Sequence, residues 1–259
     1  MPVPSNQFKI HLENVRQRFR RIRAHARSVR GALIWLTQGA AIMEDFYALK
    51  GVSFTVRPGE TLGIIGRNGS GKSTILKIIA AIFPPTAGTV EVNGRVSPLI
   101  ELGAGFHPDL TGRENVILAG VLLGFTQRQM EERFDRIIAF AELEDFIDTP
   151  VRQYATGMFA RLGFAVATEI DPDILLVDEV LAVGDESFQH KCVERINQFR
   201  RQGKTIVFVS HEMPLVRSIC DRVLLLDEGR IVTEGPPDAV IARYRTLIEE
   251  VEGRTARRR

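Results

Sequence analysis

Residues 66–74 have the residue types and the spacing of a loop that binds phosphate groups. They read GRNGSGKST, follow the apolar run TLGII and precede ILKIIAAI, so the loop is expected between a strand and a helix. Glycines let successive N–H groups point at phosphate oxygens, and the helix start adds positive potential. The residues predicted to surround the phosphates are Gly66, Asn68, Gly69, Ser70, Gly71, Lys72, Ser73 and Thr74. Lys72 is predicted to reach the β- and γ-phosphates of a nucleotide, and the Ser73 hydroxyl to ligate Mg²⁺.

Acidic and imidazole side chains follow two further apolar runs. Residues 174–179 read ILLVDE, and residues 206–211 read IVFVSH. An open parallel sheet places its ligands at the carboxyl ends of its strands, so we expect these side chains beside the phosphate loop. Asp178 suits Mg²⁺, Glu179 is placed to polarise the water that attacks a γ-phosphate, and His211 is a candidate contact to that phosphate. The predicted catalytic set is therefore Lys72, Glu179 and His211.

A small turn precedes another helical run. Residues 154–158 read YATGM and lead into FARLGFAVAT. A glycine-containing turn at the start of a helix offers N–H groups to an anion. Taken alone, this turn fits an ordinary helix cap as well as a phosphate contact.

The elements that position these motifs follow from an alternation of short apolar runs with amphipathic stretches. The runs at 174–177, 206–209 and 223–226 are continuously apolar, as expected for strands covered on both faces. The alternation predicts an α/β core with a mostly parallel sheet. Residues 106–170 are nearly all helical in pattern, which predicts a helical insertion within that core.

Composition excludes several classes of protein. Of 259 residues, 44% are hydrophobic and 25% are charged, as in an ordinary globular chain. Lys and Arg number 34 and Asp and Glu number 32, and the net charge of +2 argues against a dedicated nucleic-acid binder. The most apolar stretch, residues 116–125, is about half as long as a membrane-spanning helix. Cys192 and Cys220 match no metal-ligand spacing.

In combination, these motifs resemble those of the nucleotide-binding subunit of an ABC transporter. GRNGSGKST resembles the Walker A loop, ILLVDE resembles Walker B with its catalytic glutamate, and AVGD at 182–185 resembles the D-loop. YATGM lies where this family carries its LSGGQ-type signature, and His211 matches the switch histidine. The resemblance implies a P-loop NTPase (RecA-like) core with a mostly parallel sheet, an antiparallel β part and a helical subdomain. It also implies that the chain binds ATP and Mg²⁺ and hydrolyses ATP.

The same resemblance implies two copies of the chain arranged head to tail, with two ATP molecules sandwiched between them. A chain that carries one copy of each motif favours a homodimer. The residues expected to reach the partner's nucleotide are Thr156, Gly157, Met158 and Asp185. Met158 replaces the glutamine that is usual in the signature, so Thr156 and the backbone must supply the hydrogen bonds.

Two runs narrow the resemblance to exporters of polysaccharides such as O-antigen, capsule and teichoic acid. One is YATGM with ARLGFAVA shortly after it, and the other is ELGAGFHP at 101–108 with LTGRENV shortly after it. Glu101 stands where the family at large has a glutamine that touches Mg²⁺, and we expect its charge to slow hydrolysis. The subgroup implies a membrane permease as partner, a lipid-linked polysaccharide as substrate, and a position on the cytoplasmic face of the inner membrane.

Other functions remain as alternatives. Within transporters, the chain could serve an exporter of drugs or lipids. A soluble ABC ATPase acting on nucleic acid would usually carry a coiled-coil insertion or tandem ATPase domains, and neither is visible in the sequence. A non-enzymatic nucleic-acid-binding module is disfavoured by the intact set of Lys72, Asp178, Glu179 and His211, and we expect no nucleic-acid partner.

An arginine-rich segment lies ahead of the phosphate loop. Its arginines are Arg16, Arg18, Arg20, Arg21, Arg23, Arg27 and Arg30. The resemblance implies a basic insertion over residues 16–46 with an extra helix facing the membrane subunit. The arginines fit anionic lipid headgroups or a pyrophosphate-linked substrate, and a solvated basic helix is the alternative. By family position, Phe19 is expected to stack on adenine, with Phe46 or Tyr47 as the alternative.

The expected domain organisation is simple. Residues 1–245 are predicted to form one ABC ATPase domain that contains the helical subdomain. Residues 246–259 are predicted to form a basic C-terminal tail, with no sugar-binding domain after the ATPase.

Overall fold

Short apolar segments form a six-stranded sheet at the centre of the molecule. The computed structural model describes residues 7–23, 42–100, 102–169, 171–178 and 184–256. The strands lie in the order β5-β6-β7-β3-β8-β9, with all neighbours parallel except β8 and β9. They are β3 (Thr61–Ile65), β5 (Val96–Leu99), β6 (Ile174–Asp178), β7 (Thr205–Val209), β8 (Arg222–Asp227) and β9 (Arg230–Gly235). The predicted α/β fold is confirmed.

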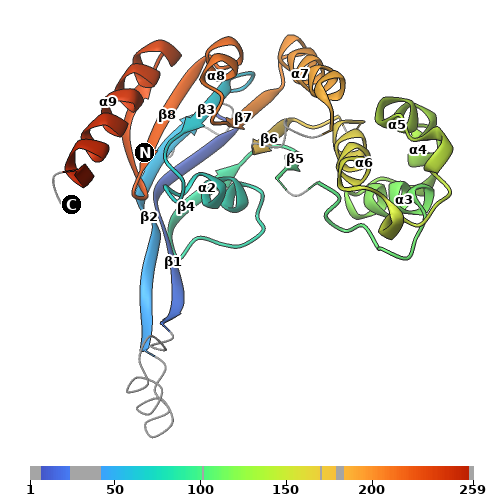
Figure 1. Ribbon diagram of the computed structural model, residues 1–259, viewed down its shortest axis with the longest axis horizontal. Coiled ribbons are helices and arrows are strands. Elements are labelled where there is room, and N and C mark those ends of the chain that lie inside the picture. Colours follow the sequence, from blue (N-terminus) through green and yellow to red (C-terminus); the bar gives the residue numbers. More distant parts are fainter. Residues whose placement is uncertain (1–6, 24–41, 101, 170, 179–183, 257–259) are drawn as a thin grey trace, which may run out of the picture.

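These strands are continuously apolar because both faces of the sheet are buried. Successive side chains of β6 point to opposite faces, so Ile174 and Leu176 join one core while Leu175 and Val177 join another. The first core is shared with α2 and a second sheet, and the other is covered by three helices and by part of α6 (Figure 1). The helices named here are α2 (Lys72–Ile79), α6 (Thr156–Glu169), α7 (Glu186–Arg201), α8 (Met213–Ile219) and α9 (Pro237–Ala256).

The second sheet is antiparallel and extends into a long two-stranded arm. Its strands are β1 (Ile10–Arg23), β2 (Ile42–Val56) and β4 (Ala87–Val92), in the order β2-β1-β4. β4 pairs with β1 only as far as Arg16, whereas β2 pairs with β1 as far as Arg23. Residues 17–23 and 42–47 therefore form an arm that projects away from the body of the molecule (Figure 1).

A group of helices with its own apolar core lies at one end of the six-stranded sheet (Figure 1). Thr111 and Thr126 begin two of these helices through capping boxes with Glu114 and Gln129. In addition to α6, the group contains α3 (Gly112–Leu122), α4 (Gln127–Glu131), α5 (Phe134–Ala141), η1 (Glu144–Phe146) and η2 (Val151–Gln153). It falls within the segment 106–170, for which a helical subdomain was expected.

The structure corrects the expected insertion at residues 16–46. Residues 16–23 and 42–46 belong to paired strands and not to a helix. The alternation of arginine with Phe19 and other residues suits a strand, in which successive side chains face opposite ways. Residues 24–41, where any extra helix would have to lie, are outside the described residues.

The predicted C-terminal tail also needs correction, because residues 246–256 continue α9. Val240 and Ile241 are buried in the core beside α8, and Leu247 is buried about two turns after Val240. This apolar stripe is spaced as a helix requires, so packing extends the helix into the tail. Within the described residues, no helix is long and apolar enough to cross a membrane.

Candidate nucleotide site

The carboxyl ends of neighbouring parallel strands meet where the phosphate loop begins. Ile64 of β3 pairs with Val209 of β7, and Val209 pairs in turn with Asp178 at the end of β6. The loop starts at Gly66, directly after β3, and His211 follows β7 by two residues. The structure thus brings the phosphate loop, Asp178 and His211 to one edge of the sheet, with His211 exposed.

Glycine is required at two places in the phosphate loop. Gly71 has a φ of 111°, and a Cβ atom there would lie 2.7 Å from the carbonyl oxygen of Ala48. Gly66 has a φ of 153°, and a Cβ atom there would collide with the carbonyl oxygen of Leu226. The loop is therefore held tightly between β2 and the end of β8, and only a residue without a side chain fits at either point.

Lys72 is held against the phosphate loop itself. The side chain is buried, and its Nζ donates to the carbonyl oxygens of Gly66 at 2.9 Å and Arg67 at 3.2 Å. The neighbouring Ser70 hydroxyl is also buried, and it has no hydrogen-bond partner in the part of the chain that the structure describes. An ammonium group and a hydroxyl group within a glycine-containing loop at the start of a helix form a site whose chemistry suits phosphate oxygens.

The donor set around the loop fits Mg²⁺ bound together with a nucleotide. Ser73 is the second residue of α2, which packs against β6, the strand that ends at Asp178. A hydroxyl and one carboxylate are oxygen ligands of the kind that Mg²⁺ accepts alongside phosphates and water. Within the described residues, no group of three or more His, Cys, Asp or Glu side chains could hold a metal ion alone. Glu101 and Glu179, the other predicted acidic residues, lie outside the described residues.

The signature turn, residues 154–158, lies beside the start of α7 and not beside the phosphate loop. Thr156 begins α6, and a Cβ atom on Gly157 would lie 4.0 Å from the Cα atom of Gly184. The turn lines a surface hollow of about 620 Å³, and no residue of the phosphate loop belongs to that lining. Its lining residues are Ala155, Thr156, Gly157, Met158, Ala160, Arg161, Gly184 and Asp185.

Arg161 joins the helix of the signature turn to the residue that begins α7. Its guanidinium donates to Asp185, donates to Glu142 at 3.1 Å, and lies 5.0 Å from the centre of the Phe188 ring. Asp185 also caps α7 by accepting from the Phe188 N–H at 2.9 Å. That N–H and the Arg161 guanidinium hold the pKa of the Asp185 carboxyl below its ordinary value. The signature turn and Asp185 are therefore fixed relative to each other.

The candidate aromatic residues for adenine are exposed on the arm and divide between its two faces. Phe19 pairs with Phe46 and Arg18 pairs with Tyr47, so Phe19 and Phe46 share a face that Tyr47 does not. The ring of Phe19 packs edge-on against Phe83 at 5.8 Å, which orients it while leaving 40% of the residue exposed.

Sequence reasoning missed several residues that shape this site. Arg161 carried a signal, since it is the only charged residue between Met158 and Thr168 in an otherwise apolar helix. No sequence pattern pointed to Gly112 or Asn115, because these residues contact residues distant in the chain or loop carbonyls. Tyr154 was noted only as the first residue of the turn.

Comparisons with known proteins identify the family. The ABC transporter family model matches residues 49–182, which contain the phosphate loop and Asp178. The O-antigen export system ATP-binding protein RfbB of Myxococcus xanthus is 47% identical over 259 residues, covering 98% of this chain and 59% of the relative. RfbB of Klebsiella pneumoniae is 50% identical over 200 residues, covering 77% of this chain and 81% of the relative.

A further relative and two solved structures agree with these matches. The teichoic acids export ATP-binding protein TagH of Lactiplantibacillus plantarum is 43% identical over 251 residues, covering 97% of this chain and 68% of the relative. The dimeric bacterial ABC transporter cassette MJ0796 is 25% identical, with a TM-score of 0.70, covering 88% of this chain and 98% of the cassette. Another structure of MJ0796, a post-hydrolysis dimer bound to ADP and Pi, has a TM-score of 0.71 at 24% identity.

The fold, the phosphate loop and these likenesses agree with one another. This chain spans 59% of the length of its Myxococcus relative, so the likeness concerns the ATP-binding part of that protein. The chain belongs to the ABC transporter family of ATP-binding proteins.

Proposed function

We propose that this chain is the ATP-hydrolysing subunit of an exporter that moves a lipid-linked polysaccharide, such as O-antigen, capsule or teichoic acid, across the cytoplasmic membrane. The observation that carries the proposal is the phosphate loop with its buried Lys72, built beside Asp178 at one edge of the sheet. The relatives named for O-antigen and teichoic acid export support the choice of substrate class.

In this proposal the chain's own groups position the triphosphate of ATP. The loop N–H groups and Lys72 bind the β- and γ-phosphates, and Ser73 and Asp178 would hold Mg²⁺, which supplies neutralising charge when bound. Glu179 would orient and deprotonate the attacking water, and His211 would contact the γ-phosphate. Asn68 and Thr74 lie in the same loop, Asn68 exposed and Thr74 half-buried, within reach of a bound nucleotide.

A second copy of the chain would complete each site. Thr156, Gly157, Met158 and Asp185 line a hollow that excludes the chain's own phosphate loop, so a nucleotide on one copy must meet the signature turn of another. The dimeric cassettes of similar fold support this arrangement. Phe19 is the proposed adenine platform, since Phe83 holds its ring in a fixed orientation.

Glu101 is proposed to face Mg²⁺ in place of a glutamine. A carboxylate there adds negative charge beside the phosphates, so we expect it to slow hydrolysis. Replacing Glu101 with Gln should raise the ATPase rate or change its Mg²⁺ dependence, and an unchanged rate and Mg²⁺ dependence would exclude this role.

The proposed membrane partner is a permease on whose cytoplasmic side the chain sits. The C-terminal end of α3 exposes three apolar residues in a row, Val121, Leu122 and Leu123, which suits contact with a permease. The arm carries several arginines near its start, among them Arg18 and Arg20. The guanidinium nitrogens of Arg18 and Arg20 lie 3.1 and 3.9 Å from the carboxylate oxygens of Asp45. These arginines suit anionic headgroups or a pyrophosphate-linked substrate.

A pair of glutamate variants tests the proposal in cells. Glu179→Gln in the chromosomal copy should abolish surface polysaccharide, whereas Glu249→Gln, an exposed position on α9, should leave it intact. In vitro, Lys72→Ala should abolish ATP hydrolysis by the purified chain. Normal surface polysaccharide in the Glu179→Gln strain, with loss of drug or lipid export instead, would overturn the assigned substrate class.

A further inference from the structure

The turn that joins β8 to β9 holds one residue in an unfavourable backbone conformation. Asp227 pairs with Arg230 across the hairpin, which leaves Glu228 and Gly229 as a two-residue turn. Their φ angles are 43° and 78°, and the type I′ turn of a tight hairpin requires positive values at both positions. Glycine adopts this conformation freely, whereas a glutamate is strained in it. Such strain persists where surrounding contacts hold the backbone in place, and this turn has contacts on two sides.

Gly229 bridges the phosphate loop and β2. Its N–H donates to the carbonyl oxygen of Ser70 at 3.0 Å, and its own carbonyl oxygen accepts from the N–H of Lys50 at 2.8 Å. The guanidinium of Arg230 donates to the carbonyl oxygen of Lys50 at 3.3 Å. We call residues 227–230, with these three bonds, the strut. The strut therefore ties Ser70 of the phosphate loop to Lys50 of β2.

The strut is packed tightly on both sides. On the side of the phosphate loop, a Cβ atom on Gly66 would collide with the carbonyl oxygen of Leu226, the residue just before the strut. On the side of β2, a Cβ atom on Gly229 would lie 2.6 Å from the carbonyl oxygen of Ala48 and 3.2 Å from the Cα atom of Leu49. The strut therefore fills the space between the loop and β2, and only glycine fits at position 229.

The strut meets β2 where the arm leaves the body of the molecule (Figure 1). β4 supports β1 only as far as Arg16, which pairs with Lys50 on β2. Directly beyond this pair the register slips, so that Ala48 is the extra residue of a bulge, and a bulge bends its strand. Because β2 is the edge strand of its sheet, the strut can hold residues 48–50 from the side opposite β1. The strut thus supports the base of the arm at the point where it bends.

The arm and the phosphate loop bind opposite ends of ATP in the proposed function, on which this inference rests. The loop binds the phosphates, and Phe19 on the arm stacks on the adenine. We propose that the strut sets the distance between these two subsites, with Gly229 and Arg230 as positioning residues for nucleotide binding. A strut displaced from β2 leaves the phosphates bound but moves Phe19 away from the base.

ADP and inorganic pyrophosphate, each with Mg²⁺, separate the two subsites, because pyrophosphate lacks the base. Their affinities for the purified chain are measured by competition against ADP with a fluorophore on its ribose. Gly229→Ala presses a methyl group against β2, so the Kd for ADP should rise about 10-fold while the Kd for pyrophosphate stays unchanged. Gly203→Ala is the control, because Gly203 also has a positive φ, 72°, but has nothing within 4 Å of an added methyl group. It should leave both affinities unchanged.

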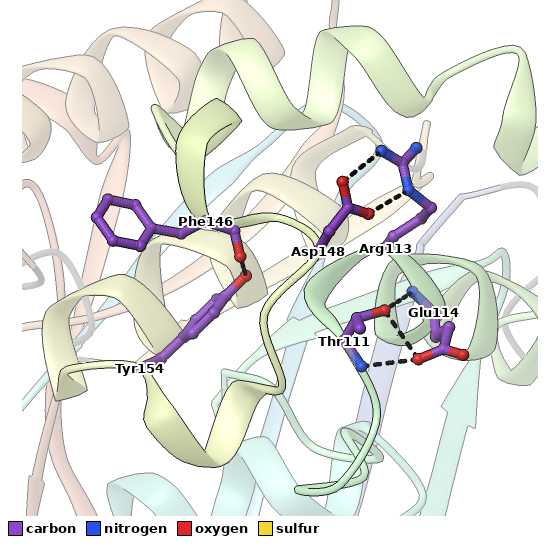
Figure 2. Close-up of polar contacts among 6 residues, drawn as sticks. All are labelled: Thr111, Arg113, Glu114, Phe146, Asp148 and Tyr154. Carbon is purple, nitrogen blue, oxygen red and sulfur yellow. Dashed lines mark hydrogen bonds and ion pairs between the residues drawn. The ribbon is translucent and has the colours of Figure 1, made fainter.

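Arg230→Gln provides a milder variant, which removes only the bond to Lys50. It should raise the Kd for ADP about 3-fold and leave the Kd for pyrophosphate unchanged. Arg113→Gln is its control, because Arg113 is another exposed arginine and lies in the group of helices, away from the strut. Figure 2 shows its two bonds to Asp148, at 2.7 and 3.2 Å. Arg113→Gln should lower the thermal midpoint at least as much as Arg230→Gln, without changing the affinity for ADP.

Three results would overturn the inference. One is an equal loss of affinity for ADP and pyrophosphate, which would mean that the strut only holds the phosphate loop together. Another is an unchanged affinity for ADP in Arg230→Gln or in folded Gly229→Ala. The third comes from combining Gly229→Ala with Phe19→Ala, which should lower the affinity for ADP little further than Phe19→Ala alone; fully additive losses would show that the strut acts independently of Phe19. A wild-type chain that binds neither ADP nor pyrophosphate would instead overturn the proposed function.

Discussion

Replacing Asn115 with alanine should destabilise residues 107–111, the loop that leads into α3. The Asn115 side chain is fully buried on α3. Its Oδ1 accepts from the His107 N–H at 2.6 Å, and its Nδ2 donates to the carbonyl oxygens of His107, Leu110 and Thr111 at 3.1, 3.0 and 2.9 Å. One amide therefore holds five residues of loop in place, which is why an asparagine is buried inside an apolar group of helices.

The loss of stability in Asn115→Ala depends on which backbone groups of the loop keep a hydrogen-bond partner. The three carbonyl oxygens also accept backbone N–H groups, from Leu110, Val151 and Asn115 itself, at 3.2, 3.0 and 3.0 Å. Only the His107 N–H loses its acceptor, which costs about 1–3 kcal/mol, and the weakened bonds and the space left behind add about 1 kcal/mol. A total of about 3 kcal/mol corresponds to a fall of about 6–12 °C in the thermal midpoint for a domain of this size.

Thermal unfolding followed by circular dichroism measures this fall. Asn93→Ala serves as the control, because the Asn93 side chain is only partly buried and donates to the Phe8 carbonyl at 3.3 Å. We expect its midpoint to fall by no more than about 4 °C. Equal midpoints for Asn115→Ala and Asn93→Ala would refute the argument that the buried amide organises the loop.

Replacing Asn115 with aspartate should make the stability of the chain depend on pH. The carboxylate would face three carbonyl oxygens in a buried site, so the folded chain favours the protonated acid and raises the pKa above its unfolded value of about 4. The variant should therefore be most stable below pH 4 and should lose stability as the pH rises to 7. A midpoint that does not change between pH 4 and pH 7, relative to wild type, would contradict this.

Three further predictions concern the surroundings of the signature turn and the thiols. Arg161→Gln should lower the ATPase rate more than the control variant Arg195→Gln. Arg195 is similarly buried, packs on a phenylalanine ring and pairs with a glutamate, but it does not contact the signature turn. Equal ATPase rates for the two variants would exclude a positioning role for Arg161. Because burial raises the pKa of Cys192 and Cys220 to about 12, neither should react with a thiol reagent at pH 8 until the chain is unfolded, and rapid labelling of the native chain would contradict their burial. The Lys191 ammonium holds the pKa of Glu142 below its ordinary value. Glu142→Gln should therefore lower the thermal midpoint at pH 7 but not near pH 3, where protonation of Glu142 has removed the advantage of the wild type. An equal fall of the midpoint at pH 7 and pH 3 would contradict this.

The fold and the position of the proposed phosphate loop between a strand and a helix were predictable because their signals are local. The glycines, Lys72 and Ser73 lie within one loop, and the flanking strand and helix are short, regular and strongly apolar. Continuous apolar runs also indicated that the sheet is buried on both faces. The structure confirms this, because neighbouring residues such as Ile174 and Leu175 pack into separate cores on opposite faces of the sheet. The likeness to ABC cassettes confirmed the fold.

The arm and the C-terminal helix were predicted wrongly because their structure depends on partners elsewhere in the chain. An arginine-rich segment has no strong preference of its own, and β2 decides its conformation by pairing with residues 16–23. Residues 246–259 were predicted to form a basic tail, but the apolar stripe that docks α9 on β8 and α8 carries the helix through residues 246–256.

The sequence by itself determined what chemistry the chain can perform, since phosphate binding needs only a few residues at short spacing. The tertiary structure decided how the motifs stand relative to one another. It separates the signature turn from the phosphate loop, bonds Arg161 to Asp185, and seats Tyr154 against Gly112. These relations join residues more than twenty positions apart, and side-chain contacts over such separations are set by packing and chain topology, which no local pattern encodes.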